Sequence, residues 1–142
     1  TMAAPQVMEM SIPPELSAKV DVKASELLNL YVRDDGKIFY HNGEDVGNAD
    51  PEPLEMKQVK DFSVSRNLKL KNRLIMALKV SEDAKYETVI NILDELNLAE
   101  AVLIEEMPKQ VDNEGNQIEK RERRFTIADL TDEEIEILKE LE

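Results

Sequence analysis

The sequence predicts an α+β fold, a mixed β-sheet with two helices on one face and a further helix at the C-terminus. Three observations support this prediction. Apolar and polar residues alternate over 27–41 around an Asp-Gly turn, as in a β-hairpin. The apolar run 74–78 has the length of a buried strand. Residues 86–93 carry apolar side chains at helical spacing. The expected order of elements is strand, β-hairpin, helix, strand, helix, strand.

Residues 1–26 are predicted to form an N-terminal arm with a short strand. Apolar side chains alternate over 7–12, and Pro13-Pro14 ends this strand because proline lacks the N–H group that a central strand needs. Such a strand suits the edge of a sheet, or a position exchanged between two copies of the chain.

The hairpin gives the clearest pattern in the chain. Leu28, Leu30 and Val32 share one face of its first strand, and Ile38 and Tyr40 match them on the return strand. The turn between the strands contains Gly36, which accepts a positive φ without steric cost. We expect this apolar face to point into the core.

The middle of the chain alternates loop, helix and strand. Residues 43–53 are rich in Gly, Asn, Asp and Pro and are predicted to be a loop. A helix is expected within 54–71, followed by a strand over 73–80. The next helix begins near Tyr86 and is expected to end near Asn97. The residues expected to be largely buried are Leu28, Leu30, Ile75, Val89, Ile90 and Leu93.

Two interpretations fit the segment 101–128. In the first, residues 101–106 form a strand, and 124–128 pair back on it after a turn at 112–116. In the second, the preceding helix continues through Met107, and 124–128 is the only late strand. A final helix follows, because Thr131 and Glu134 have capping-box spacing and Leu130 and Ile135 occupy the positions of a hydrophobic staple.

Composition excludes several classes of function. The chain has 142 residues, with 31 acidic against 18 basic side chains and a formal net charge of −13. This balance argues against binding nucleic acid or an anionic lipid surface. No apolar run approaches the ~20 residues of a membrane-spanning helix, so any membrane link is expected through a segment absent from this chain.

The sequence offers no chemistry that would make this protein an enzyme. It has no cysteine, which excludes a thiolate metal site or a cysteine nucleophile, and His41 is its single histidine. A structural or solvated role is therefore expected for His41. Neither a phosphate-binding loop nor a nucleophile–base pair is present, so no catalytic residue, cofactor or metal is expected. The one basic cluster, 120–124, is interpreted as the solvated face of a strand or linker.

Three segments together resemble the ExbD/TolR family. The buried strand 73–79 leads through a short polar loop to Tyr86 and a helix ending in Leu93-Asp94-Glu95-Leu96, which resembles the hallmark of this family. The hairpin followed by Asn42-Gly43 resembles the family's "V-D-x-x-G-x-I-Y-x-N-G" element. Residues 8–14 resemble the short strand just outside the family's membrane helix. The resemblance covers roughly Met8 to Glu106.

The resemblance implies a domain organisation and a function. Residues 1–26 would be the arm after a missing membrane anchor, 27–107 an ExbD/TolR-like periplasmic domain, and 108–142 a charged C-terminal extension ending in an amphipathic helix. The domain would belong to an inner-membrane protein of a Gram-negative bacterium that couples the proton-motive force to outer-membrane transport. The family's proton-carrying Asp, inside the membrane helix, has no counterpart in this sequence. The alternative is an acidic α+β binding or regulatory domain with no membrane link.

The resemblance also implies partners. These are an ExbB- or TolQ-like channel protein, a TonB- or TolA-like periplasmic protein, and a second copy of the chain in a homodimer. An extended partner segment is expected to add to an exposed strand edge. The candidate contact residues are Tyr86, Val102 and Ile104, the last two on the late strand, together with Met10 and Ile12 in the N-terminal strand.

Overall fold

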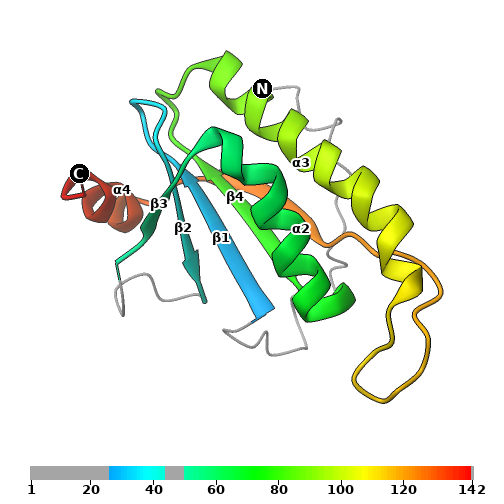
Figure 1. Cartoon of the computed structure of the whole chain (residues 1–142). Helices are drawn as coiled ribbons and strands as arrows, with labels where there is room; N and C mark the ends of the chain where they lie inside the picture. The colour runs from blue at the N-terminus through cyan, green and yellow to red at the C-terminus, as the bar shows by residue number, and fades with distance from the viewer. Residues whose placement is uncertain (1–25, 44–49, 142) are drawn as a thin grey trace.

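The computed structural model describes residues 26–43 and 50–141, which form one mixed five-stranded sheet with helices on both faces (Figure 1). The strand order is β3-β2-β1-β4-β5. The strands are β1 (Leu27–Val32), β2 (Ile38–Asn42), β3 (Glu52–Leu54), β4 (Ile75–Val80) and β5 (Phe125–Asp129). The α-helices are α2 (Val59–Leu70), α3 (Tyr86–Glu106) and α4 (Asp132–Lys139), and short 3-10 turns are η4 (Met56–Gln58), η5 (Lys71–Arg73) and η6 (Met107–Lys109). The α+β class expected from the sequence is confirmed.

The predicted hairpin is present in the predicted register. β1 and β2 are antiparallel, with Leu30 opposite Tyr40 and Val32 opposite Ile38. Gly36 has φ +89°, and its N–H donates to the Arg33 carbonyl over 2.9 Å, which closes the turn. A side chain at this φ would be strained, which explains why a glycine is required here.

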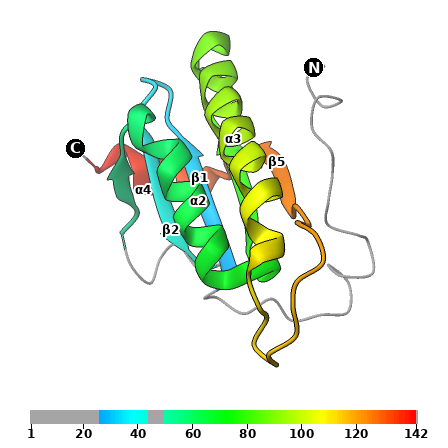
Figure 2. The same cartoon turned by 45° about the vertical axis from the view of Figure 1, so that its right-hand side comes forward.

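Parallel pairing joins the hairpin to the later strands. β4 pairs in parallel with β1 on one side and with β5 on the other, and α3 makes the crossover from β4 to β5. Helices α2 and α3 lie side by side on one face of the sheet (Figure 2). The main core forms between this face and the two helices, from Leu28, Leu30, Val32, Ile38, Leu54, Val59, Leu74, Met76, Leu78, Ile92, Leu93, Leu96 and Phe125.

Most of the expected core residues are buried. Leu28, Leu30, Ile75 and Leu93 are at most 5% exposed, whereas Val89 and Ile90 are only partly buried at the rim of α3. Ile75 alternates with Leu74 and Met76 along the chain, so it points to the opposite face of the sheet from the main core.

The second interpretation of 101–128 is the one the structure bears out. Residues 101–106 are the last turns of α3 rather than a strand, so the expected strand there, and the expected helix end near Asn97, are wrong. The buried stripe of α3 continues through Leu96, Ala99 and Leu103, each at most 3% exposed. This spacing continues the buried side of the helix to Leu103, and tertiary burial decides the conformation of a run that could also have been a strand.

The segment 43–54 also differs from its prediction. Residues 52–54, expected to lie in a loop and a helix, instead form β3, which pairs antiparallel with β2. The helix expected within 54–71 is confirmed as α2, but it begins at Val59, after η4.

Helix α4 covers part of the other face of the sheet. Its Leu138 packs against Tyr31 of β1 and Phe39 of β2, and all three are at most 2% exposed. The capping box is present: the Thr131 hydroxyl accepts from the Glu134 N–H over 3.2 Å, and the Glu134 carboxylate accepts from the Thr131 N–H over 2.9 Å. The other oxygen of the Glu134 carboxylate accepts from the Lys79 ammonium of β4 over 2.7 Å.

The turn of the hairpin also holds the end of α4. Arg33 donates to the carbonyl oxygens of Leu138 and Leu141 over 2.7 and 2.8 Å, so it satisfies acceptors that a helix C-terminus leaves without partners. The same guanidinium binds the Asp35 carboxylate through two nitrogens, over 3.0 and 2.8 Å. This hydrogen bonding lowers the pKa of Asp35 from 3.8 to about 2.

We expect Asp35→Asn to show a pH-dependent loss of stability. A carboxyl group with a lowered pKa in the folded state stabilises the fold above its unfolded pKa of 3.8, and this contribution is lost as pH falls through about 2. Because the carboxylate is 45% exposed, solvent screening limits the contribution to about half a kcal/mol. Urea titrations near neutral pH should show a lower free energy of unfolding for Asp35→Asn than for the parent chain. This difference should disappear as the pH falls toward about 2. A difference that persists unchanged in acid would contradict this assignment.

Candidate functional site

The two edges of the sheet differ in their capacity to pair with another chain. β3 is three residues long, and its middle residue, Pro53, has no backbone N–H. Short edge strands with proline resist pairing with a further strand. β5 at the opposite edge has five residues and no proline. Among the described residues, β5 is therefore the edge that can accept another strand.

The hydrogen bonds between β4 and β5 show which backbone groups point away from the sheet. The Met76 N–H donates to the Arg124 carbonyl, and the Leu130 N–H donates to the Val80 carbonyl. Backbone groups alternate along a strand, so Thr126 and Ala128 also point toward β4. The N–H and C=O groups of Ile127 and Asp129 consequently face outward at the open edge. A partner strand would find an ordered row of donors and acceptors there.

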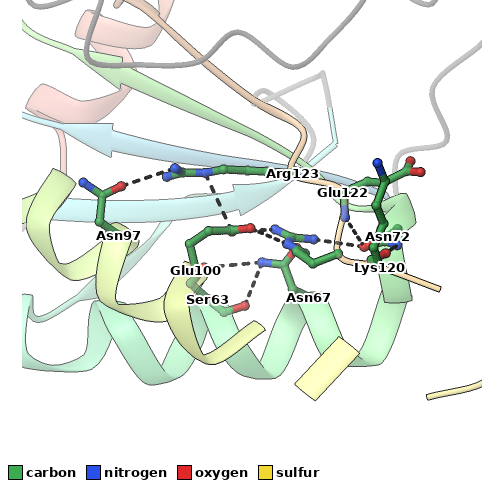
Figure 3. Close-up of polar contacts among 9 residues, drawn as sticks. Ser63, Asn67, Asn72, Asn97, Glu100, Lys120, Glu122 and Arg123 are labelled. Carbon is green, nitrogen blue, oxygen red and sulfur yellow. Dashed lines mark hydrogen bonds and ion pairs between the residues drawn. The ribbon is translucent and has the colours of Figure 1, made fainter. Parts of the chain in front are cut away.

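A polar network fixes the segment that leads into β5 (Figure 3). Arg121 binds the Glu100 carboxylate of α3 through two nitrogens, over 2.8 and 3.0 Å. Arg123 lies 3.7 Å from the same carboxylate and donates to the Asn97 side chain over 3.2 Å. Asn72 of η5 binds this segment on its other side, with its amide donating to the Lys120 carbonyl and its oxygen accepting from the Glu122 N–H. The start of β5 is therefore anchored to α3 and to η5.

This network changes the interpretation of the basic cluster 120–124. The Arg121 side chain is only 5% exposed, so the cluster is not simply the solvated face of a linker. A buried guanidinium is costly unless it is paired in good geometry, and the bidentate pair with Glu100 provides this. The cluster stabilises the position of β5.

Two of the expected contact residues flank the β5 side of α3. Tyr86 and Ile104 are 69% and 61% exposed and are 18 residues apart, which is five helical turns, so they lie on the same side of the helix. Asn97 lies near the same side of α3 and contacts Arg123, which belongs to the segment before β5. The side of α3 that carries Tyr86 and Ile104 therefore faces this segment. The high exposure of Tyr86 shows that its ring is not part of the core.

Val102 does not share that side. It was expected to lie with Ile104 on one strand, where residues two apart point to the same face. The strand expected to carry both residues is wrong, because both lie on α3, where residues two apart lie on nearly opposite sides. Met10 and Ile12, and the strand expected at 7–12, lie outside the described residues.

Sequence reasoning missed two features of this region. Ile127 and Asp129 were not singled out, because the open edge becomes evident only once β5 is placed beside β4. Leu98, which is 52% exposed, was also missed. An apolar residue within a helical pattern is ordinarily assigned to the core, and only its phase relative to Leu93 and Leu96 indicates otherwise.

The titratable groups of the described residues include no candidate metal centre. No group of three or more His, Cys, Asp or Glu side chains in this part of the chain could hold a metal ion. His41 is 7% exposed and Tyr31 is 1% exposed, and neither the His41 Nδ1 nor the Tyr31 hydroxyl has a hydrogen-bond partner. Burial, and then the charge of Glu134, raise the pKa of Tyr31 well above its usual range, so its hydroxyl stays protonated.

Comparison with known proteins assigns the chain to a family. The family model described as biopolymer transport protein ExbD/TolR matches residues 1–105. The chain belongs to the ExbD/TolR family. No curated protein matches the chain significantly. The ExbD/TolR match ends one residue before the end of α3, so β5 and α4 lie beyond it although they pack on the same sheet.

Membership in the ExbD/TolR family carries a general role. Its members act in biopolymer transport, and they are inner-membrane proteins with periplasmic domains. They work with ExbB- or TolQ-type and TonB- or TolA-type partners. Within 26–43 and 50–141, none of the helices combines the length and apolar character needed to cross a membrane.

Proposed function

We propose that this chain is the periplasmic domain of a protein that couples the proton-motive force to a TonB- or TolA-like partner, and that it captures an extended segment of that partner at the β5 edge. The observation that carries the proposal is the open β5 edge in a member of a family that works with such partners. The outward N–H and C=O groups of Ile127 and Asp129 would bind the partner backbone. Tyr86 and Ile104 would contact its side chains from α3.

The surroundings of β5 support this mode of binding. Backbone pairing gives affinity only when the receiving edge is held in place, since ordering a loose strand costs conformational entropy. The Arg121–Glu100 pair and the Asn72 contacts hold the segment before β5, and the Leu130 N–H bond to Val80 holds the residue after it. The edge is therefore preorganised for a partner strand.

Two further features of the proposed coupling involve the whole protein. The chain would act as a homodimer, with residues 7–12 exchanged or placed at an edge, and it would be driven through an ExbB- or TolQ-like channel protein. Its net charge of −13 favours a basic partner segment and makes association weaken with salt.

Asp129→Pro is expected to weaken partner capture at least about tenfold, because a partner strand loses one backbone hydrogen bond and meets the proline ring at the edge. The Asp129 N–H points away from β4, so the sheet itself loses no bond. The effect is measured by isothermal titration calorimetry. The titrant is a peptide covering the periplasmic segment of the TonB- or TolA-like partner. Tyr86→Ala should also weaken binding while leaving the thermal midpoint nearly unchanged.

The matched control is Asp129→Asn, which removes the charge and keeps the backbone N–H. It should bind within about twofold of the parent chain at moderate salt, where exposed charges are screened. Equal weakening by both variants would mean that the Asp129 side chain, rather than the strand edge, binds the partner. Unchanged binding by Asp129→Pro would reject capture at β5.

A further inference from the structure

The outer face of α3 presents one continuous line of exposed residues. The line consists of Glu87, Asn91, Asp94, Leu98, Ala101 and Glu105. Its members are alternately four and three residues apart along the 21 residues of the helix. This is the spacing of a seam between two helices, and all six residues are exposed. The opposite side of α3 is buried: Ile92 and Leu96 lie in the main core with the sheet, and Leu103 is also buried. Figure 2 shows α3 beside α2 in the helical layer.

Exposed apolar side chains concentrate on this helix. Within the part of the chain that the structure describes, four large hydrophobic residues are exposed, and Tyr86, Leu98 and Ile104 of α3 are three of them. Leu98 and Ala101 lie on the outer line, whereas Tyr86 and Ile104 lie on the side of α3 that faces the segment before β5. The outer face therefore offers a small apolar surface at Leu98 and Ala101.

The charges on α3 are all of one sign. The helix contains six acidic residues and no lysine or arginine. Glu100 pairs with Arg121 and Glu106 pairs with Lys109. Glu87, Asp94 and Glu105, on the outer line, have no ion-pair partner among the described residues. Solvent-exposed helices ordinarily carry both signs of charge at spacings of three and four.

We propose that this outer face of α3 binds a basic amphipathic helix of a partner protein. Leu98 and Ala101 would receive the apolar side of that helix, and the unpaired acids Glu87, Asp94 and Glu105 would bind its lysines or arginines. The line from Glu87 to Glu105 is about 27 Å long, which matches a helix of five turns. The small apolar area makes this a weak, reversible contact.

Charge decides among the possible occupants. A second copy of the chain would bring the same acidic face against this one, which is unfavourable for a molecule of net charge −13. Anionic lipid and nucleic acid are repelled for the same reason. The site goes beyond the proposed function, because it takes a helix on α3 rather than an extended strand at β5.

The test uses the full chain and two synthetic helical peptides of about five turns. Both have leucines at alternating spacings of three and four, and one is flanked by lysines whereas the other is flanked by glutamates. We expect the lysine peptide to bind, with affinity falling as salt rises, and the glutamate peptide not to bind. Leu98→Ser should raise the Kd of the lysine peptide about fivefold or more. Asp94→Asn with Glu105→Gln should raise it similarly and reduce its salt dependence.

Matched controls separate this face from general attraction to an acidic protein. Val111 has the same 52% exposure as Leu98 but lies off α3, so Val111→Ser should leave the Kd within about twofold. Glu133→Gln with Glu136→Gln removes two exposed acids from α4 and should also have little effect. Asp129→Pro should leave binding of the lysine peptide unchanged. A failure of this proposal can therefore be told apart from a failure of strand capture at β5.

Three outcomes would overturn the proposal. One is equal weakening by the α3 and control variants, which would indicate non-specific charge attraction. Another is unchanged binding after Leu98→Ser, in a variant whose circular dichroism shows an intact fold. The third is a dimer in sedimentation that Leu98→Ser dissociates, because the face would then join two copies of the chain.

Discussion

Leu93→Ala is expected to lower the free energy of unfolding by about 2–5 kcal/mol. Leu93 is 3% exposed and lies in the main core between α3 and the sheet. Truncation removes buried apolar surface and leaves a cavity that the surrounding side chains fill only in part. Denaturant unfolding followed by circular dichroism measures the loss.

Leu98→Ala is the matched control, since it makes the same substitution five residues later on the same helix. Leu98 is 52% exposed, so its loss should cost about half a kcal/mol or less. Similar losses in the two variants would show that the buried face of α3 is assigned wrongly.

Glu100→Ala is expected to destabilise the domain by about 3 kcal/mol or more. The substitution leaves the Arg121 guanidinium, with a side chain only 5% exposed, without its carboxylate partner. Its remaining described hydrogen bond is to the Asn72 oxygen over 3.4 Å, too long to compensate a buried charge. The loss should appear as a lower midpoint of urea unfolding with an unchanged slope.

Two comparisons isolate the ion pair in this second experiment. Asp94→Ala removes an exposed acid from the same helix and should change stability by about half a kcal/mol or less. Glu100→Leu combined with Arg121→Met should be more stable than Glu100→Ala, because no unpaired charge stays buried. If Glu100→Ala behaves like Asp94→Ala, the pair does not hold the segment before β5.

The sequence was sufficient to predict elements whose signals are local. The hairpin register follows from residues two apart around Gly36, and the capping box of α4 follows from Thr131 and Glu134. The same holds for the stripe of α3 near Leu93 and for the family, whose motifs lie within residues 8–106. In each case the residues that decide the structure are neighbours in sequence.

The errors arose where distant contacts decide the structure. Residues 101–104 are four consecutive apolar residues, a pattern that fits a strand or a buried helix equally well. Burial of Leu103 on one side of α3 selects the helix. Likewise, no local pattern shows that Arg33 binds the end of α4, 105 residues away along the chain, or that Ile127 lies at an open edge.

Residue-resolved amide hydrogen exchange at the β5 edge tests the central proposal most directly. The full chain would be compared with and without a peptide covering the periplasmic segment of its TonB- or TolA-like partner. Capture by backbone pairing predicts slower exchange of the Ile127 and Asp129 amides, with the amides of Thr126 and Ala128, which point toward β4, unchanged. Binding of the peptide without protection of Ile127 and Asp129, or with protection at β3 instead, would contradict capture at β5.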